Sequence, residues 1–182
     1  IESHSYRAFL IPFSHRGGIQ LQHESAETLP LREVSHYEDW ISRLNTIDVY
    51  INNHIEIANQ GIQEGIMPPR ILMERVLGQI EKQAFVKPSE SPFYKAFTEI
   101  PDSISNENKK IIQKSALEVI EKKVIPSYVV FYNFFKNEYL PNCRETIGIN
   151  KLPKGSDYYE FLAKKFTTTN LSPNEIHDIG LS

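Results

Sequence analysis

Apolar residues recur along this chain mostly at helical spacing. The first such group is Trp40, Ile41, Leu44 and Ile47, whose consecutive members lie one, three and three positions apart. Ser35 and Glu38 form a capping-box pattern just before the group, which predicts a helix that starts there. We expect one long helix, or two stacked helices with a restart near Asp48, that continue to Gly61, a favourable residue at a helix C-terminus.

Two later stretches are also helical, in different surroundings. Residues 106–124 follow the capping residue Ser105 and place their apolar side chains on one arc, with lysines and glutamates opposite, so this helix should pack on one side only. Residues 128–140 include nine apolar or aromatic side chains among thirteen, distributed nearly all round a helical wheel. This predicts a helix in the middle of a domain. A buried strand at residues 128–132 also fits the β propensity, but the run exceeds the usual strand length.

The C-terminal residues 152–182 carry the densest local signals. Ser156 or Asp157 is placed to cap a helix with one wide apolar face, formed by Tyr158, Tyr159, Phe161, Leu162 and Phe166. Threonines 167–169 end this helix, because consecutive β-branched residues favour extended backbone. Ser172 and Glu175 then form a second capping box around Pro173, which predicts another helix. Because the sequence ends soon afterwards, we expect a piece of a longer protein, truncated within this helix.

Together these elements predict a mainly α-helical fold in a single domain, residues 1–182. A short extended piece is expected near the N-terminus, at residues 8–11, before the turn at Gly17 and Gly18. A second extended piece is expected at 167–170, unless the threonines form a connecting turn. The turn at Gly17 and Gly18 lacks the spacing and the lysine of a phosphate-binding loop.

Composition narrows the classes of partner. The chain has 20 basic and 23 acidic residues, a net charge of -3, and no basic stripe, so a nucleic-acid partner is not expected. No apolar run approaches the roughly 20 residues of a membrane span. Cys143 is the single cysteine, which excludes an internal disulfide and the cysteine frameworks that hold zinc or iron–sulfur clusters.

Candidate chemistry is sparse. The chain contains no H-E-x-x-H motif, and its six histidines never recur at i, i+3 or i+4. His177 falls within the buried arc of its predicted helix, where a structural role is favoured over a role at a site. Tyr158 and Tyr159 are similarly better explained as an aromatic core than as substrate contacts. The threonines could offer an unpaired backbone edge to a peptide, or form a turn.

Short blocks in a fixed order resemble a known family. They are Tyr37-Glu38-Asp39-Trp40, Gly65-Ile66-Met67-Pro68-Pro69-Arg70, Ser91-Pro92-Phe93-Tyr94, Glu138-Tyr139-Leu140-Pro141, Leu152-Pro153-Lys154-Gly155, Tyr158-Tyr159, Thr167-Thr168-Thr169 and Leu171-Ser172-Pro173-Asn174-Glu175-Ile176-His177. In these blocks the chain resembles the bacterial family catalogued as domain of unknown function 885, whose members are considered zinc metallopeptidases. The family's zinc motif, a histidine–glutamate pair with a second histidine on one helix, lies downstream of this stretch.

The resemblance implies an enzyme whose zinc site lies in a part of the protein outside this chain. Zinc is expected in the full-length protein, whereas this chain holds no metal ligand and no catalytic residue and should be inert alone. It would supply one wall of a peptide-binding cleft, with substrate contacts at Tyr158, Tyr159, Thr168, Thr169 and His177. Its partners would be the missing C-terminal part of its own chain and a peptide, in the periplasm or cell envelope. The alternative is a non-catalytic helical interaction module.

Overall fold

The computed structural model describes residues 6–182, and these residues form helices joined by turns. The predicted mainly α-helical fold is confirmed, and the described residues include no strand, only two isolated bridges. The α-helices are α1 (Val34–Asn45), α2 (Ile47–Glu64), α3 (Arg70–Ala84), α4 (Asn106–Val119), α5 (Ile125–Phe134), α6 (Gly155–Thr167) and α7 (Pro173–Leu181). Two 3-10 helices, η2 (Ala8–Leu10) and η3 (Ile19–Thr28), precede them.

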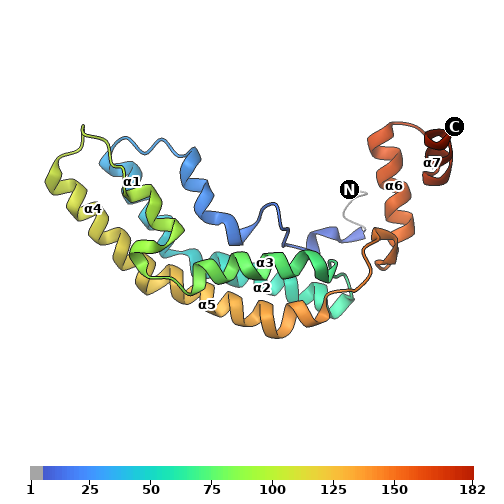
Figure 1. Ribbon diagram of the computed structural model, residues 1–182, viewed down its shortest axis with the longest axis horizontal. Coiled ribbons are helices and arrows are strands. Elements are labelled where there is room, and N and C mark those ends of the chain that lie inside the picture. Colours follow the sequence, from blue (N-terminus) through green and yellow to red (C-terminus); the bar gives the residue numbers. More distant parts are fainter. Residues whose placement is uncertain (1–5) are drawn as a thin grey trace.

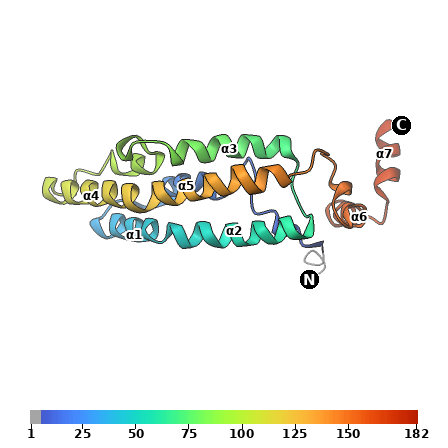
Figure 2. The ribbon, with the colours of Figure 1, turned by 90° about the horizontal axis from the view of Figure 1, so that it is seen from below.

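The helices build a crescent (Figure 1). Three of them, α2, α3 and α5, lie side by side as a base, with α5 between the other two (Figure 2). At one end α1 packs against α4, and at the other end α6 and α7 rise from the base as an arm. The N-terminal segment, residues 6–28 with η2 and η3, crosses the base on the side from which the arm rises. We call this the concave side.

A nearly continuous helical segment, residues 106–142, forms the spine of the molecule. It contains two widened π-turns, Ile120–Val124 and Phe135–Tyr139, each followed closely by a proline, Pro126 and Pro141. A proline ring has no N–H to donate and clashes with the carbonyl four residues earlier. The wider turns relieve this clash, so the helix continues through both prolines.

Side chains beside both prolines add hydrogen bonds to nearby carbonyls of the helix. Ser127 Oγ donates to the carbonyl of Lys123 at 2.7 Å, and Asn142 Nδ2 donates to the carbonyl of Glu138 at 2.7 Å. Residues 128–140 are helical throughout, as expected, and the buried-strand alternative is wrong.

Aromatic rings join the N-terminal segment to the spine. Phe13, only 2% exposed, packs against Phe131, Phe135 and Tyr139 with ring centroids 5.1, 5.5 and 5.0 Å away. Nearby, the hydroxyl of Tyr128 donates to the carbonyl of Ile19 at 2.5 Å. Burial raises the pKa of the Tyr128 phenol, so it remains a neutral donor. These contacts fix the segment that crosses the concave side.

The extended piece predicted at residues 8–11 is wrong. Ala8–Leu10 is a 3-10 turn that follows a left-handed Arg7, and the N–H of Ile11 closes the turn on the carbonyl of Ala8. Leu10 is fully buried. Burial of this side chain against the base therefore outweighs the β propensity of the apolar run.

The helix end predicted at Gly61 is also wrong, because α2 continues to Glu64. Gly65, with φ of 68°, ends it, and the N–H groups of Gly65 and Ile66 donate to the carbonyls of Ile62 and Gly61 as in a Schellman motif. The restart near Asp48 is confirmed, since α1 ends at Asn45 and α2 begins at Ile47.

Two predicted caps are wrong and two are confirmed. Glu33 and His36, not Ser35 and Glu38, form the box that begins α1. Neither Ser156 nor Asp157 caps α6, which begins at Gly155 after a left-handed Lys154. The confirmed caps are Ser105, which accepts from Asn108 N, and Ser172, which accepts from Glu175 N, each at 3.3 Å.

Acidification is expected to fray α7. The carboxylate of Glu175 accepts a hydrogen bond from Ser172 N at 2.7 Å, which holds the pKa of Glu175 below its ordinary value of 4.5. A lowered folded-state pKa means that this stabilisation is complete above pH 4.5 and is lost as pH falls through the lower value. Amide exchange in α7 should accelerate as the pH falls below 4.5, after correction for the intrinsic rate. Glu175→Gln should abolish this dependence, and protection that stays constant in the unmodified chain would contradict the assignment.

Candidate functional site

The five residues predicted to contact substrate all lie on the arm, but they are not all together. Tyr158 and Tyr159 are in the first turns of α6, whereas Thr168 and Thr169 follow its last residue. Thr168 follows Tyr159 by nine positions, a rise of about 14 Å along a helix. The arm thus has a tyrosine end near the base and a threonine end at its tip, and α7 with His177 follows the threonine end (Figure 1).

Tyr158 anchors the arm to the N-terminal segment. Its ring stacks on Tyr6 with centroids 4.9 Å apart, and Phe161 packs on the same Tyr6 ring at 5.5 Å. Tyr158 is half-buried but lies outside the main hydrophobic core, and its neighbour Tyr159 is 50% exposed, so the aromatic core predicted for this pair is wrong. Of the two tyrosines, Tyr159 is the one available to a ligand.

The threonines form a turn. Thr167 is the last residue of α6, and Thr168 is left-handed with φ of 56°. The hydroxyl of Thr169 lies 2.9 Å from that of Thr167 and accepts from the N–H of Leu171 at 3.4 Å. The extended piece predicted at 167–170 is therefore wrong, because local hydroxyl bonding outweighs the β-branched preference for extended backbone.

His177 is exposed, which corrects its predicted place in a buried arc. Among the described elements α7 packs mainly on α6, and only Ile176 and the residues around the cap are half-buried. A single neighbouring helix covers too little of α7 to bury a second arc. The side chain of His177 is therefore exposed on the surface of the arm and is not part of a core.

The described residues do not provide a metal centre. No group of three or more histidine, cysteine, aspartate and glutamate side chains within residues 6–182 is placed to hold a metal ion, and His4 lies outside the described residues. The donor set of this part of the chain therefore does not fit zinc. No helix of the described residues is long and apolar enough to cross a membrane.

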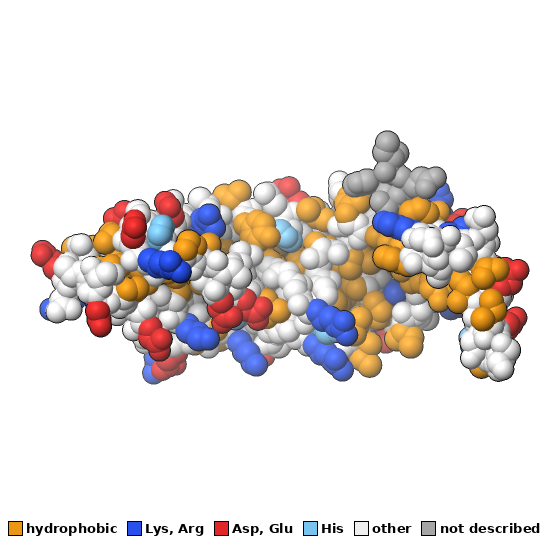
Figure 3. All heavy atoms as spheres, turned by 90° about the horizontal axis from the view of Figure 1, so that it is seen from above, with side chains coloured by type: hydrophobic (Ala, Val, Ile, Leu, Met, Phe, Trp, Pro, Cys, Tyr) orange, Lys and Arg blue, Asp and Glu red, His pale blue; other side chains and the backbone are white. Residues whose placement is uncertain are grey.

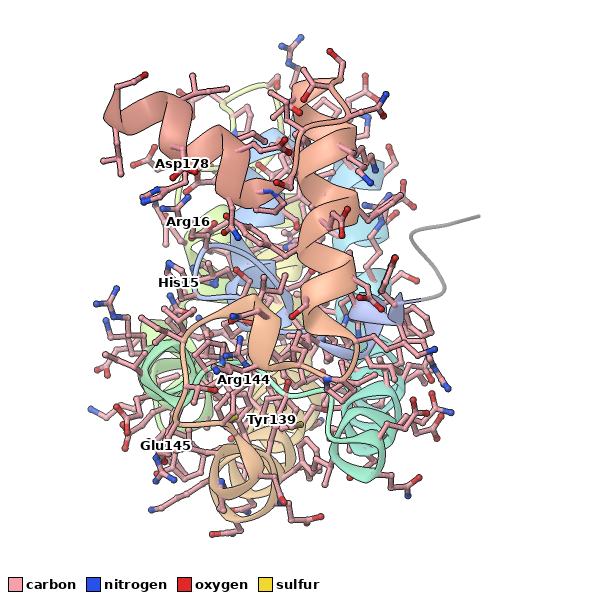
Figure 4. The ribbon with its side chains drawn as sticks, turned by 90° about the vertical axis from the view of Figure 1, so that its right-hand side faces the viewer. His15, Arg16, Tyr139, Arg144, Glu145 and Asp178 are labelled. Carbon is pink, nitrogen blue, oxygen red and sulfur yellow. The ribbon has the colours of Figure 1, made fainter. Side chains whose placement is uncertain are left out.

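Arg144 organises the corner from which the arm rises, a role that the sequence did not signal. Its backbone N–H donates to Pro68 O at 3.1 Å, and its carbonyl accepts from Arg70 N at 2.8 Å. Its guanidinium donates to the carbonyls of Met67 and Gly148 at 3.0 and 2.8 Å. Partial burial lowers the pKa of Arg144. Figure 4 shows it at the foot of α6.

A pocket of about 530 Å³ lies at the opposite end of the molecule, away from the arm. It is lined by residues of η3, of the segment before α1 and of the turn that begins at Pro92. His23 on its wall shares a hydrogen bond of 3.0 Å with the buried amide of Gln83, and burial lowers the pKa of His23. The pocket and the predicted substrate residues are therefore separate features.

Apolar side chains gather on the concave side toward the arm. Figure 3 looks onto this side and shows them at the end of the molecule that carries α6 and α7, with a group of basic side chains next to them. The exposed large apolar residues of the arm are Tyr159, Phe166, Ile179 and Leu181. Exposed apolar side chains that gather in one region offer a surface on which polypeptide or ligand can pack.

Comparison with known proteins defines the class. The family described as "Bacterial protein of unknown function (DUF885)" matches residues 4–182. The chain belongs to this family, which confirms that part of the resemblance found in the sequence. No curated protein matches the chain.

A solved structure has the same fold. It is described as "the putative lipoprotein from Colwellia psychrerythraea", and it is 22% identical with a TM-score of 0.83. The match covers 94% of this chain and 30% of that chain. The present chain thus spans less than a third of the solved protein's length.

Proposed function

We propose that this chain is the substrate-side helical portion of a larger zinc metallopeptidase that hydrolyses peptide bonds. The observation that carries the proposal is the arm, which stands at one end of the concave side and exposes apolar side chains that the described residues leave uncovered. The family membership and the greater length of the solved relative support it. In the larger protein, the remaining polypeptide would pack against the arm.

The metal-ligating side chains of the described residues indicate which part of the larger protein would do what. The described residues do not fit a zinc site, so the metal and the glutamate that activates water would come from polypeptide outside this chain. This portion would bind and orient the peptide. Holding the peptide in one orientation can itself contribute a large part of the rate enhancement, because it limits the peptide's motion. The 182-residue chain alone would be inert.

Within the arm we assign substrate contact to Tyr159 and His177, which are both exposed. Thr168 and Thr169 would contact a peptide through side chains only, because the left-handed Thr168 breaks the extended edge that strand pairing requires. Tyr158 would orient α6 through its stack on Tyr6.

Replacing Tyr159 and His177 separately by alanine in the full-length protein tests the assignment. Each change is expected to lower kcat/KM for peptide hydrolysis by about fivefold without a change in melting temperature, since both side chains are exposed. Lys110→Ala is the control, because Lys110 is exposed on α4 at the opposite end. Unchanged turnover in both folded variants would remove these residues from the site.

The second candidate is a non-catalytic helical module of a bacterial protein. The uncovered apolar side chains of the arm favour it equally, because a partner domain would bury them. The two functions differ in whether a chelator abolishes peptide turnover by the full-length protein. For either function we propose the periplasm or cell envelope, since the solved relative is described as a "putative lipoprotein".

A further inference from the structure

A short loop on the concave side, residues 14–18, is held by several hydrogen bonds. The N–H of Gly17 donates to the carbonyl of Ser14 at 3.3 Å, and the N–H of Arg16 donates to the hydroxyl of Ser14 at 3.3 Å. Gly18, with φ of 134°, then turns the chain into η3. This conformation favours glycine, so the sequence pair Gly17-Gly18 serves the turn.

Two glutamine amides hold the loop from beneath. Gln20, which is 0% exposed, donates through Nε2 to the carbonyl of Ser14 at 2.6 Å, and Gln79 of α3 donates through Nε2 to the carbonyl of His15 at 3.1 Å. Nε2 of Gln20 also lies 3.2 Å from Oε1 of Gln79. The loop backbone is thus bound to two elements far apart in sequence, with its carbonyls directed into the body.

The side chain of Arg16 is left free by this arrangement. It is exposed, and within residues 6–182 it forms no ion pair with an acidic side chain, whereas Arg7 pairs with Glu64 at 2.8 Å. Figure 4 shows His15 and Arg16 above the base helices, on the side from which α6 and α7 rise. A guanidinium on a rigid backbone therefore faces the same space as the arm.

We infer that Arg16 binds a carboxylate of a peptide that lies along the concave side, either the terminal carboxylate or that of an acidic side chain. The inference rests on the proposed function, which places a peptide there. A guanidinium presents a planar fork of N–H donors that matches the two oxygens of a carboxylate. The glutamine-held backbone lowers the entropic cost of binding, because the loop is already ordered.

Three synthetic peptides test the inference by their binding to this chain. They are tetra-alanine with a free C-terminal carboxylate, tetra-alanine amide, and an N-acetylated, C-terminally amidated tetrapeptide with one glutamate. Titration would be followed through the amide chemical shifts of residues 14–18. We expect at least one carboxylate peptide to bind about fivefold more tightly than tetra-alanine amide, the range of a solvent-exposed ion pair.

Variants make the test specific. Arg16→Ala should abolish the preference for the carboxylate, and Arg16→Lys should retain part of it. Arg43→Ala, at an exposed arginine of α1, should leave it unchanged. Tighter binding of tetra-alanine would identify the terminal carboxylate as the group that Arg16 binds, and tighter binding of the glutamate peptide would identify an acidic side chain.

Two results would overturn the inference. One is equal binding of all three peptides, and the other is a carboxylate preference that survives in Arg16→Ala. Equal binding would still leave the proposed peptide-binding function standing. Conversely, a full-length protein without metal-dependent turnover would reject the proposed function and leave this binding measurement valid.

Discussion

Replacement of Phe13 by alanine should lower the free energy of unfolding by about 3–5 kcal/mol, the usual range for a buried phenylalanine. Phe13 is 2% exposed and lies among the rings of Phe131, Phe135 and Tyr139. Its loss leaves a cavity at the point where the N-terminal segment joins the spine. Chemical denaturation followed by circular dichroism measures the effect.

The control for Phe13 is the same substitution at an exposed site. Phe166→Ala on the arm, at a side chain that is 77% exposed, should change the free energy of unfolding by no more than about 0.5 kcal/mol. If Phe13→Ala does not fold, Phe13→Leu supplies a milder test, with a loss of about 1–2 kcal/mol. Equal stabilities for Phe13→Ala and Phe166→Ala would show that the N-terminal segment is not packed on the spine.

Alanine at Gly61 should destabilise the chain by about 1–3 kcal/mol. A Cβ atom there would lie 2.6 Å from the carbonyl oxygen of Leu10 and 3.2 Å from that of Ile66. Both atoms belong to backbone, so the N-terminal turn would have to move away from α2. Thermal and chemical denaturation would record the loss.

Alanine at Gly78 is expected to have the opposite effect on stability to alanine at Gly61. It lies within α3, and a Cβ atom there would have no neighbour within 4 Å. Gly78→Ala should therefore stabilise the chain by about 0.5–1 kcal/mol, because alanine loses less backbone entropy in a helix. If Gly61→Ala were also stabilising, the close approach of Leu10 to α2 would be wrong.

Helical periodicity was sufficient to predict the fold class, because long apolar repeats are set by burial on one face. The spine is the clearest case, since the length of residues 128–140 favoured a helix over a strand. The box at Ser172 and Glu175 was predicted correctly because both partners are local in sequence.

Features that depend on distant partners were not predictable. Gly61 resembles a helix end in sequence, yet its missing side chain admits the backbone of Leu10, fifty-one positions earlier. Likewise, Arg144 gives no local signal, because its partners are carbonyls of the α2–α3 connection and of its own loop. The π-turns respond to two prolines that a simple rule would treat as helix breaks.

The sequence located the proposed site residues on two neighbouring helices, but it did not give the environment of each side chain. Helical spacing located the aromatic face of α6, but it gave Tyr158 and Tyr159 the same environment, whereas Tyr6 buries only the first of them. His177 was expected in a buried arc because periodicity alone cannot show that α7 has one packing neighbour. The loop with Arg16 was recognised as a turn, and its support by Gln20 and Gln79 required the fold.

The most direct test of the account is peptide hydrolysis by the full-length protein and by this 182-residue chain, each with and without a zinc chelator. If the proposed function is right, a chelator abolishes turnover by the full-length protein, added zinc restores it, and the 182-residue chain shows no turnover. Zinc-independent turnover by the full-length protein, or chelator-sensitive turnover by the 182-residue chain alone, would contradict it.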